Sequence, residues 1–168
     1  MGNGYRFSGR HLSPHFRVGE FKCQHCGRVV VSASLLDRLE KLRSNIGNTP
    51  VRIISAYRCL DCGRSTELCN SNLHSSGDAV DFTTCGKLNA AEVLLKVTGV
   101  FNCVGLNQLE SGRKLSFIHV DTRSSLLYWL SRYDSDRGKR VYTYFNTVEH
   151  MLAAMRKDKQ TDWFGMVV

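Results

Sequence analysis

Four side chains of types that bind metal ions stand in two short segments of this sequence. His74 and Asp81 lie in the first segment, and His119 and Asp121 lie in the second. Imidazole and carboxylate groups are the ligands of catalytic zinc, where three protein groups leave a fourth position for water or substrate. Zinc in such a site lowers the pKa of its water and polarises a carbonyl group, which is the chemistry of hydrolysis. We therefore take His74, Asp81, His119 and Asp121 as candidate residues of a metal site.

The residues around Asp81 support this hypothesis. Spacing alone does not separate a metal site from ordinary loop or core histidines. Gly77 allows a tight backbone path between His74 and Asp81, and Ala79 leaves room beside it. Asp81 also lies in an otherwise apolar predicted strand, where a buried charge is costly without a partner such as a metal.

Four of the seven cysteines form two matching pieces, Cys23-Gln-His-Cys26-Gly27 and Cys59-Leu-Asp-Cys62-Gly63. Each piece has the form of a zinc knuckle, in which two thiolates share a turn. Two knuckles make a four-thiolate site, so Cys23, Cys26, Cys59 and Cys62 are candidate ligands of a second, structural zinc, ahead of free thiols and disulfides. His25 is not expected to be a ligand. The other three cysteines, Cys69, Cys85 and Cys103, are expected to be small core residues.

The elements that must position these residues are predicted from hydrophobic spacing. An amphipathic helix is expected from Ser32 to Ile46, ended by Gly47. A second helix is expected over 89–98 with Asn89 as its cap, and a third from Asn146 with Glu149 completing a capping box. Four strands are predicted, at 51–55, 79–82, 104–109 and 115–120, with a long loop at 59–78. The expected fold class is α+β, a small antiparallel sheet flanked by helices.

The composition fits one globular domain spanning 1–168. The chain has 42% hydrophobic residues and a net charge of +8, which raises its concentration near nucleic acid, anionic lipid or teichoic-acid-bearing cell wall. No apolar run is long enough for a membrane span, and the first residues lack the apolar stretch of a signal peptide. We expect synthesis in the cytoplasm.

Five motifs, in order, resemble the zinc D-alanyl-D-alanine carboxypeptidases and related bacterial and phage cell-wall peptidases, whose fold is shared with the Hedgehog signalling domain. They are Pro14-His-Phe-Arg-Val-Gly-Glu-Phe21, the helix through Leu42-Arg43, Ile54-Ser-Ala-Tyr-Arg58, His74-x-x-Gly77-x-Ala79-x-Asp81 and Phe117-Ile-His-Val-Asp-Thr-Arg123. The resemblance covers about residues 12–130, and 131–168 are then a C-terminal extension with a helix.

The resemblance implies a catalytic zinc held by His74, Asp81 and His119, with Arg58 near the substrate. An arginine there can bind a carboxylate or steady an oxyanion. Some branches of the family have an acidic residue three positions before the last ligand, where this chain has Ser116. Asp121 is therefore the candidate general base, although it could equally orient His119 from behind.

The function implied is hydrolysis of peptidoglycan stem or cross-link peptides, as a D,D-carboxypeptidase or an endopeptidase. A phage lysis enzyme acting at the bacterial cell wall is one such role. The expected form is a monomer without nucleic-acid partners. Two alternatives stay open: a non-catalytic wall-binding module of the same fold, and a four-cysteine zinc-finger protein that binds nucleic acid.

Overall fold

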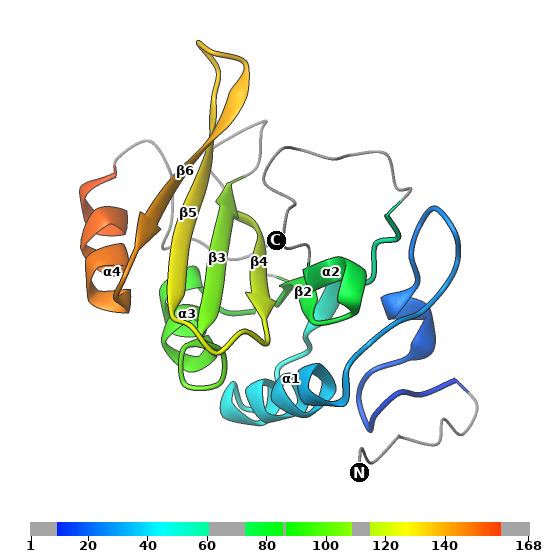
Figure 1. Cartoon of the computed structure of the whole chain (residues 1–168). Coiled ribbons are helices and arrows are strands. Elements are labelled where there is room, and N and C mark those ends of the chain that lie inside the picture. Colours follow the sequence, from blue (N-terminus) through cyan, green and yellow to red (C-terminus); the bar gives the residue numbers. More distant parts are fainter. Residues whose placement is uncertain (1–9, 61–72, 86, 109–114, 159–168) are drawn as a thin grey trace.

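The fold is α+β, as predicted. The computed structural model describes residues 10–60, 73–85, 87–108 and 115–158. A six-stranded sheet with the order β1-β2-β4-β3-β5-β6 is packed against helices (Figure 1). The strands are β1 (Arg52–Ser55), β2 (Ala79–Thr83), β3 (Cys103–Gln108), β4 (Leu115–Asp121), β5 (Leu127–Asp134) and β6 (Lys139–Phe145). The helices are the 3₁₀ turn η1 (Val18–Phe21), α1 (Ala33–Asn45), α2 (Leu73–Ser76), α3 (Ala90–Val97) and α4 (Val148–Lys157).

The sheet is mixed and extends beyond the four predicted strands. The hairpin of β5 and β6 was not predicted, and β5 pairs with β3 in parallel while the other pairs are antiparallel. The connection at 122–126 passes the end of β3 and reverses direction. Because β5 then runs opposite to β4, and β4 runs opposite to β3, the pair of β3 and β5 must be parallel.

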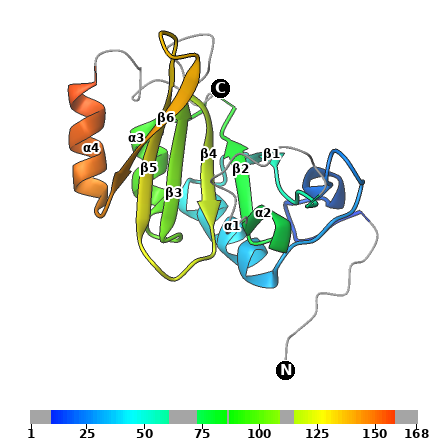
Figure 2. The ribbon, with the colours of Figure 1, turned by 45° about the horizontal axis from the view of Figure 1, so that its top comes forward.

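Helices cover one face of the sheet and leave the other face more open. Figure 2 shows α1 and α3 on the same side of the sheet, with α4 beside β6. Side chains alternate along a strand, so Val104 and Leu106 of β3 join the core with Leu39 of α1 and Val93 of α3. Gly105, between the two core residues of β3, faces the opposite side. That open face carries the site residues of β2 and β4.

The helix ends follow local capping chemistry. The Ser32 hydroxyl accepts a hydrogen bond from the Leu35 backbone N–H at 3.2 Å, and Gly47 after α1 has φ +66°. Asn89 and Glu92 form a capping box at α3, which confirms the predicted start. The predicted start of α4 is corrected by one residue, since Thr147 rather than Asn146 is its cap.

The prediction that Cys69, Cys85 and Cys103 are core residues is wrong for Cys85. Cys103 is fully buried in β3, as expected. Cys85 is exposed and has φ +53°, because it stands in a turn immediately after β2 rather than in an element. Cys69 lies outside the described residues. Within the described part of the chain, no helix combines the length and apolarity needed to span a membrane.

Candidate metal centre and catalytic site

Three predicted metal ligands converge at the open face of the sheet. His74 comes from α2, and Asp81 of β2 stands directly opposite His119 of β4. Their ligand atoms all lie within 4.8 Å of one another. Asp81 Oδ1 is 2.8 Å from His119 Nδ1 and 3.5 Å from His74 Nε2. Tetrahedral zinc places neighbouring nitrogen and oxygen ligands about 3.3 Å apart, so this donor set fits zinc.

The second nitrogen of each imidazole ring is engaged on the side away from this centre. His74 Nδ1 lies 2.7 Å from the Ala56 carbonyl oxygen, to which it donates a hydrogen bond when the ring proton is on Nδ1. His119 Nε2 lies 3.4 Å from Asp121 Oδ2. Such outer partners fix the ring orientation and the tautomer of metal-binding histidines. Both rings therefore present a lone pair to the same point.

The backbone between His74 and Asp81 depends on Gly77. This glycine has φ +79°, and a Cβ atom built on it would lie 2.6 Å from the carbonyl carbon of Val30. Its carbonyl oxygen accepts a hydrogen bond from Ser32 N–H at 2.9 Å. A side chain is excluded both by conformation and by space. Gly77 thus lets the chain turn from α2 into β2 while staying packed on the start of α1.

The charges at the centre call for a cation. Burial alone would raise the pKa of Asp81, but hydrogen bonds from His119 and His74 hold it well below its usual range. Burial would lower the pKa of His119, but hydrogen bonds to Asp121 and Asp81 raise it to about 9. Without a metal, a proton on His119 balances the charge of Asp81, while Arg123 balances that of Asp121. A divalent cation between His74, Asp81 and His119 supplies that positive charge instead.

Asp121 is fully buried and is held by Arg123, which the sequence reasoning did not single out. The Arg123 guanidinium donates to both Asp121 oxygens, with Nε at 2.9 Å from each and Nη2 at 2.7 Å from Oδ2. The Arg123 backbone N–H adds a bond at 3.1 Å. Only the two-residue spacing from Asp121 could have suggested this pair. Asp121 therefore lies between the His119 ring and the Arg123 guanidinium, which holds its carboxylate in place.

A second candidate group overlaps the first. Cys103, His119 and Asp121 also bring ligand atoms within 4.8 Å of one another. Burial and the nearby charge of Asp121 raise the pKa of the Cys103 thiol far above its usual range, so a thiolate is disfavoured. Because Asp121 is also bound to Arg123, the group of His74, Asp81 and His119 is the better metal site.

Arg58 reaches the same centre from the rim. Its guanidinium Nη2 lies 3.7 Å from Asp81 Oδ2, and its side chain is 44% exposed. Its backbone N–H donates to the His74 carbonyl oxygen at 3.2 Å, which joins the segment after β1 to α2. The structure thus brings together all five predicted residues of this site, and Arg58 is the one that solvent reaches most easily.

Three of the four predicted thiolates also meet. The sulfur atoms of Cys23, Cys26 and Cys59 lie within 4.8 Å of one another, and those of Cys23 and Cys59 are 3.7 Å apart. This distance is too long for a disulfide bond. It matches the spacing of about 3.8 Å between thiolates around tetrahedral zinc. Cys62, the fourth predicted ligand, lies outside the described residues.

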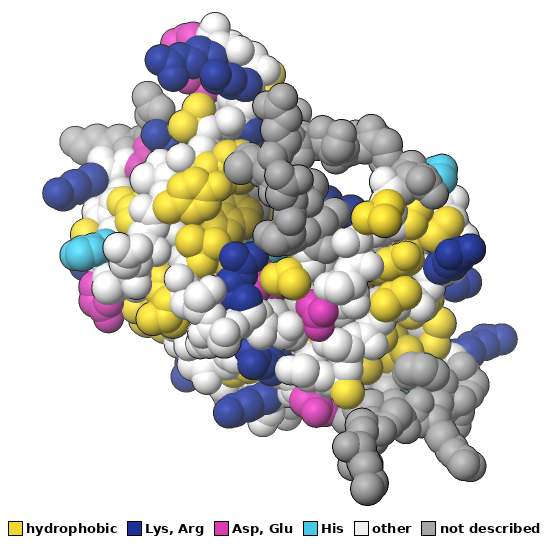
Figure 3. All heavy atoms as spheres, in the orientation of Figure 1, with side chains coloured by type: hydrophobic (Ala, Val, Ile, Leu, Met, Phe, Trp, Pro, Cys, Tyr) yellow, Lys and Arg dark blue, Asp and Glu magenta, His cyan; other side chains and the backbone are white. Residues whose placement is uncertain are grey.

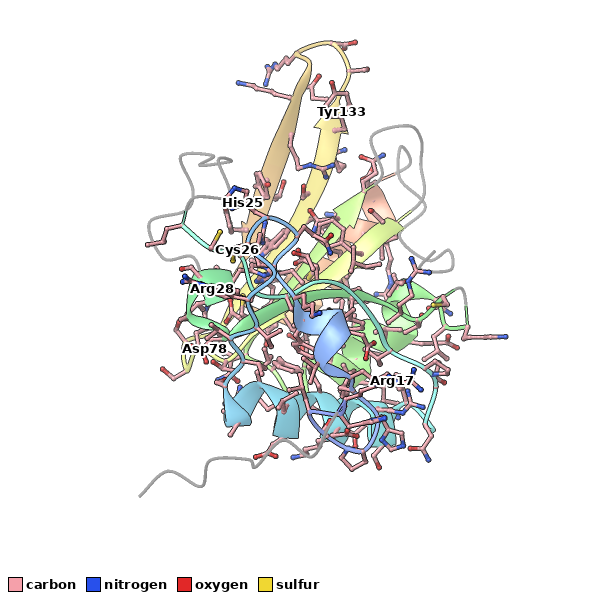
Figure 4. The ribbon with its side chains drawn as sticks, turned by 90° about the vertical axis from the view of Figure 1, so that its right-hand side faces the viewer. Arg17, His25, Cys26, Arg28, Asp78 and Tyr133 are labelled. Atoms are coloured by element: carbon pink, nitrogen blue, oxygen red, sulfur yellow. The ribbon has the colours of Figure 1, made fainter. Side chains whose placement is uncertain are left out.

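The turn that carries Cys23 and Cys26 has the hydrogen bonds of a knuckle. Gly27 has φ +70°, and its N–H donates to the Cys23 carbonyl oxygen at 2.9 Å. The Cys59 N–H points at Cys23 Sγ at 3.5 Å. His25 Nδ1 lies 3.3 Å from Cys59 Sγ, closer than the sequence suggested. Figure 4 shows His25, Cys26 and Arg28 on this turn.

The fold is α+β, and His74, Asp81 and His119 meet on its open face as a group that could hold a metal ion. A family model described as peptidase M15 matches residues 14–121. The chain therefore belongs to the peptidase M15 family, which consists of zinc metallopeptidases, as the motifs had indicated. The match includes His74, Asp81 and His119. No curated protein and no solved structure shows significant similarity to the chain.

Proposed function

We propose that this chain is a zinc-dependent peptidase that hydrolyses the stem or cross-link peptides of bacterial peptidoglycan. The observation that carries the proposal is the convergence of His74 Nε2, Asp81 Oδ1 and His119 Nδ1 within 4.8 Å, with the far nitrogen of each ring already engaged. The five motifs shared with cell-wall peptidases support the substrate class. A phage lysis enzyme acting at the cell wall is the role that this resemblance favours.

The metal supplies one part of the chemistry, and the side chains supply the rest. When bound, zinc acts as a Lewis acid that polarises the peptide carbonyl and acidifies water. Arg58 lies at the rim, 3.7 Å from Asp81, so its guanidinium can pair with a substrate carboxylate or with the developing oxyanion. Asp81 binds the metal on one side and faces Arg58 on the other.

Asp121 acts in this proposal as a positioning residue for His119. Both of its oxygens accept bonds from Arg123, and Oδ2 also faces His119 Nε2. Its side chain is fully buried, and its charge is balanced by Arg123 and by the ring of His119. A carboxylate engaged in this way is better suited to fix a ring than to collect a proton from substrate. The general-base role is therefore the less favoured of the two that the sequence left open.

The proposal is tested with two soluble substrates, a stem pentapeptide ending in D-Ala-D-Ala and a cross-linked dimer of stem peptides. Purified protein should cleave at least one of them, lose activity on chelation and regain it with added zinc. His119→Ala should abolish cleavage while the circular dichroism spectrum stays that of the folded protein. Full activity of His119→Ala would refute the proposal.

We also propose that Cys23, Cys26 and Cys59 hold a second, structural zinc, with Cys62 expected as the fourth ligand. The support is the 3.7 Å sulfur separation and the knuckle turn at Gly27. This zinc would tie the N-terminal turn to the segment that carries Arg58, next to Cys59 in sequence. Its effect on catalysis would be indirect, through the placement of that arginine.

Cysteine variants separate the two zinc sites. Cys59→Ser should lower the zinc content by about one ion per chain and leave the His119-dependent zinc in place. His25→Ala should keep both ions, whereas Cys62→Ser should lose one. A Cys59→Ser protein with the zinc content of the unmodified chain would rule out the structural site.

A further inference from the structure

A single row of residues crosses the open face of the sheet and leads away from the metal centre. The strand register places Asp81 opposite His119, and His119 opposite Gly105. Gly105 in turn stands opposite Trp129, and Trp129 opposite Tyr144. Because directly paired residues point to the same face, the metal ligands and these aromatic side chains share one surface.

Gly105 is the gap in this row that lets the aromatic surface reach the metal centre. A Cβ atom on Gly105 would lie 2.0 Å from the indole ring of Trp129. The indole therefore covers the glycine and approaches the next strand. Its ring centroid lies 5.6 Å from that of His119, with the planes inclined at 39°. Trp129 is thus a wall of the catalytic centre.

The aromatic contacts continue from Trp129 to the edge strand β6. The ring centroid of Tyr142 lies 5.5 Å from that of Trp129 and 6.4 Å from that of Tyr144, and the two tyrosine rings are nearly parallel at 15°. Figure 3 shows hydrophobic side chains gathered over β5 and β6 on this face. We call Trp129, Tyr142 and Tyr144 the aromatic track.

Core packing does not account for the aromatic track. The core under this hairpin is built by Tyr128 and Leu130, which point to the other face and are 5% exposed. Trp129 and Tyr142 are only half-buried, and Tyr144 is 52% exposed. Large aromatic surfaces left in solvent beside a catalytic centre are typical of a binding site.

We propose that the aromatic track is a subsite for the glycan part of peptidoglycan, in which pyranose rings stack on Trp129, Tyr142 and Tyr144. This inference rests on the proposed function and extends it from the peptide to the attached sugar. The three track residues lie beyond the matched residues 14–121, and the first of them, Trp129, is in ring contact with His119. A sugar bound there is continuous with a peptide bound at the metal.

The chemistry of the track favours a sugar over a second peptide segment. An extended peptide binds a sheet through free backbone groups at an edge. β5 is paired on both sides, with β3 and β6, and although β6 is the edge strand, Tyr142 and Tyr144 present their rings on the face of the sheet that carries Trp129. The track offers ring faces instead, and the C–H face of a pyranose ring is apolar and flat. Tyrosine hydroxyls at the rim can meet the sugar hydroxyls.

The test compares two substrates with the same stem peptide, one free and one attached to the N-acetylglucosamine–N-acetylmuramic acid disaccharide. Tyr142→Ala and Tyr144→Ala should each raise KM for the sugar-bearing substrate by about two- to tenfold and leave the free peptide unaffected. Tyr144→Phe, which keeps the ring and loses only the hydroxyl, should raise KM less than Tyr144→Ala does. Leu95→Ala, an exposed apolar residue on α3, is the control for general surface loss.

The outcomes distinguish this inference from the proposed function. If the unmodified chain cleaves neither substrate, the proposed function fails and the subsite fails with it. If it cleaves both, and the tyrosine variants change neither or change both equally, the subsite is refuted while the peptidase stands. A concentration-dependent dimer that Tyr144→Ala dissociates, measured by light scattering, would likewise overturn the subsite in favour of a second copy of the chain.

Discussion

Asp81 and His119 face each other across β2 and β4, with 2.8 Å between Oδ1 and Nδ1. This contact joins the two motifs, which are far apart in sequence, at one point of the sheet. Two side chains carried by loops would not keep this distance as closely, because loops move more than paired strands. The register between β2 and β4 therefore sets the distance between two of the three ligands in the proposed metal site.

Asp121→Asn should weaken zinc binding without removing a ligand. The amide keeps the shape of the side chain but loses the charge that holds His119 Nε2. Loss of such an outer partner typically lowers metal affinity by about 10- to 100-fold. Competition with a zinc chelator of known affinity measures the change. Asp136→Asn, an exposed residue of the turn between β5 and β6, is the matched control, and an equal affinity in both variants would contradict the role of Asp121.

Gly105→Ala should destabilise the fold and damage catalysis together. The new Cβ atom would lie 2.0 Å from the Trp129 ring, so the indole must leave its place beside His119. Overpacking of this kind costs about 1–3 kcal/mol in free energy of unfolding. Gly19→Ala, whose Cβ meets nothing within 4 Å, should be nearly neutral in urea unfolding. Equal stability of the two variants would contradict the placement of Trp129.

Gly77→Ala should cost more stability than Gly138→Ala. Both glycines have positive φ, and an alanine in that conformation costs about 1–2 kcal/mol. Only Gly77 adds a clash, with the backbone of Val30 at 2.6 Å. Urea unfolding of both variants measures the difference. Equal losses would show that the turn after His74 has room for a side chain.

Glu40→Gln should weaken, in a pH-dependent way, the attachment of the segment around Ser13 and His15 to α1. Glu40 accepts bonds from Ser13 Oγ at 2.5 Å and from His15 Nδ1 at 2.7 Å. Burial would raise the pKa of Glu40, but these bonds lower it below 4.5. Stabilisation by a carboxyl with a lowered pKa is present above the unfolded value and is lost as the pH falls. The difference in Tm between the two proteins should shrink below pH 4.5, and a constant difference would contradict this account.

The sequence was sufficient for the elements whose pattern is local. The leucines of α1 recur at helical spacing, and Asn89 and Glu92 mark the start of α3. The candidate ligands His74, Asp81 and His119 were predicted from residue type and motif order, and the structure brings them together. What local pattern cannot show is the partner of each strand, so the parallel pairing of β3 with β5 was not foreseen.

The hairpin of β5 and β6 was missed because its alternation is hidden. Tyr128 packs into the core while Trp129 lies on the open face, so large aromatic residues stand on both sides of the strand. Hydrophobic alternation then gives no clear period of two. The sequence also left the role of Asp121 undecided. Its burial and its hydrogen bonds with Arg123 depend on the tertiary structure, which local pattern does not show. The need for a glycine at position 105 also depends on tertiary structure, because it follows from the Trp129 ring that packs over it.

The most direct test of the central claim is the zinc content of the unmodified chain and of His119→Ala, measured by elemental analysis on the samples used for the hydrolysis assay. We expect the variant to hold about one zinc ion fewer per chain and to cleave no wall peptide. The difference between the two proteins is informative whether or not the cysteine site is occupied. A variant with the full zinc content and full activity would contradict the assignment of His119 to a catalytic metal.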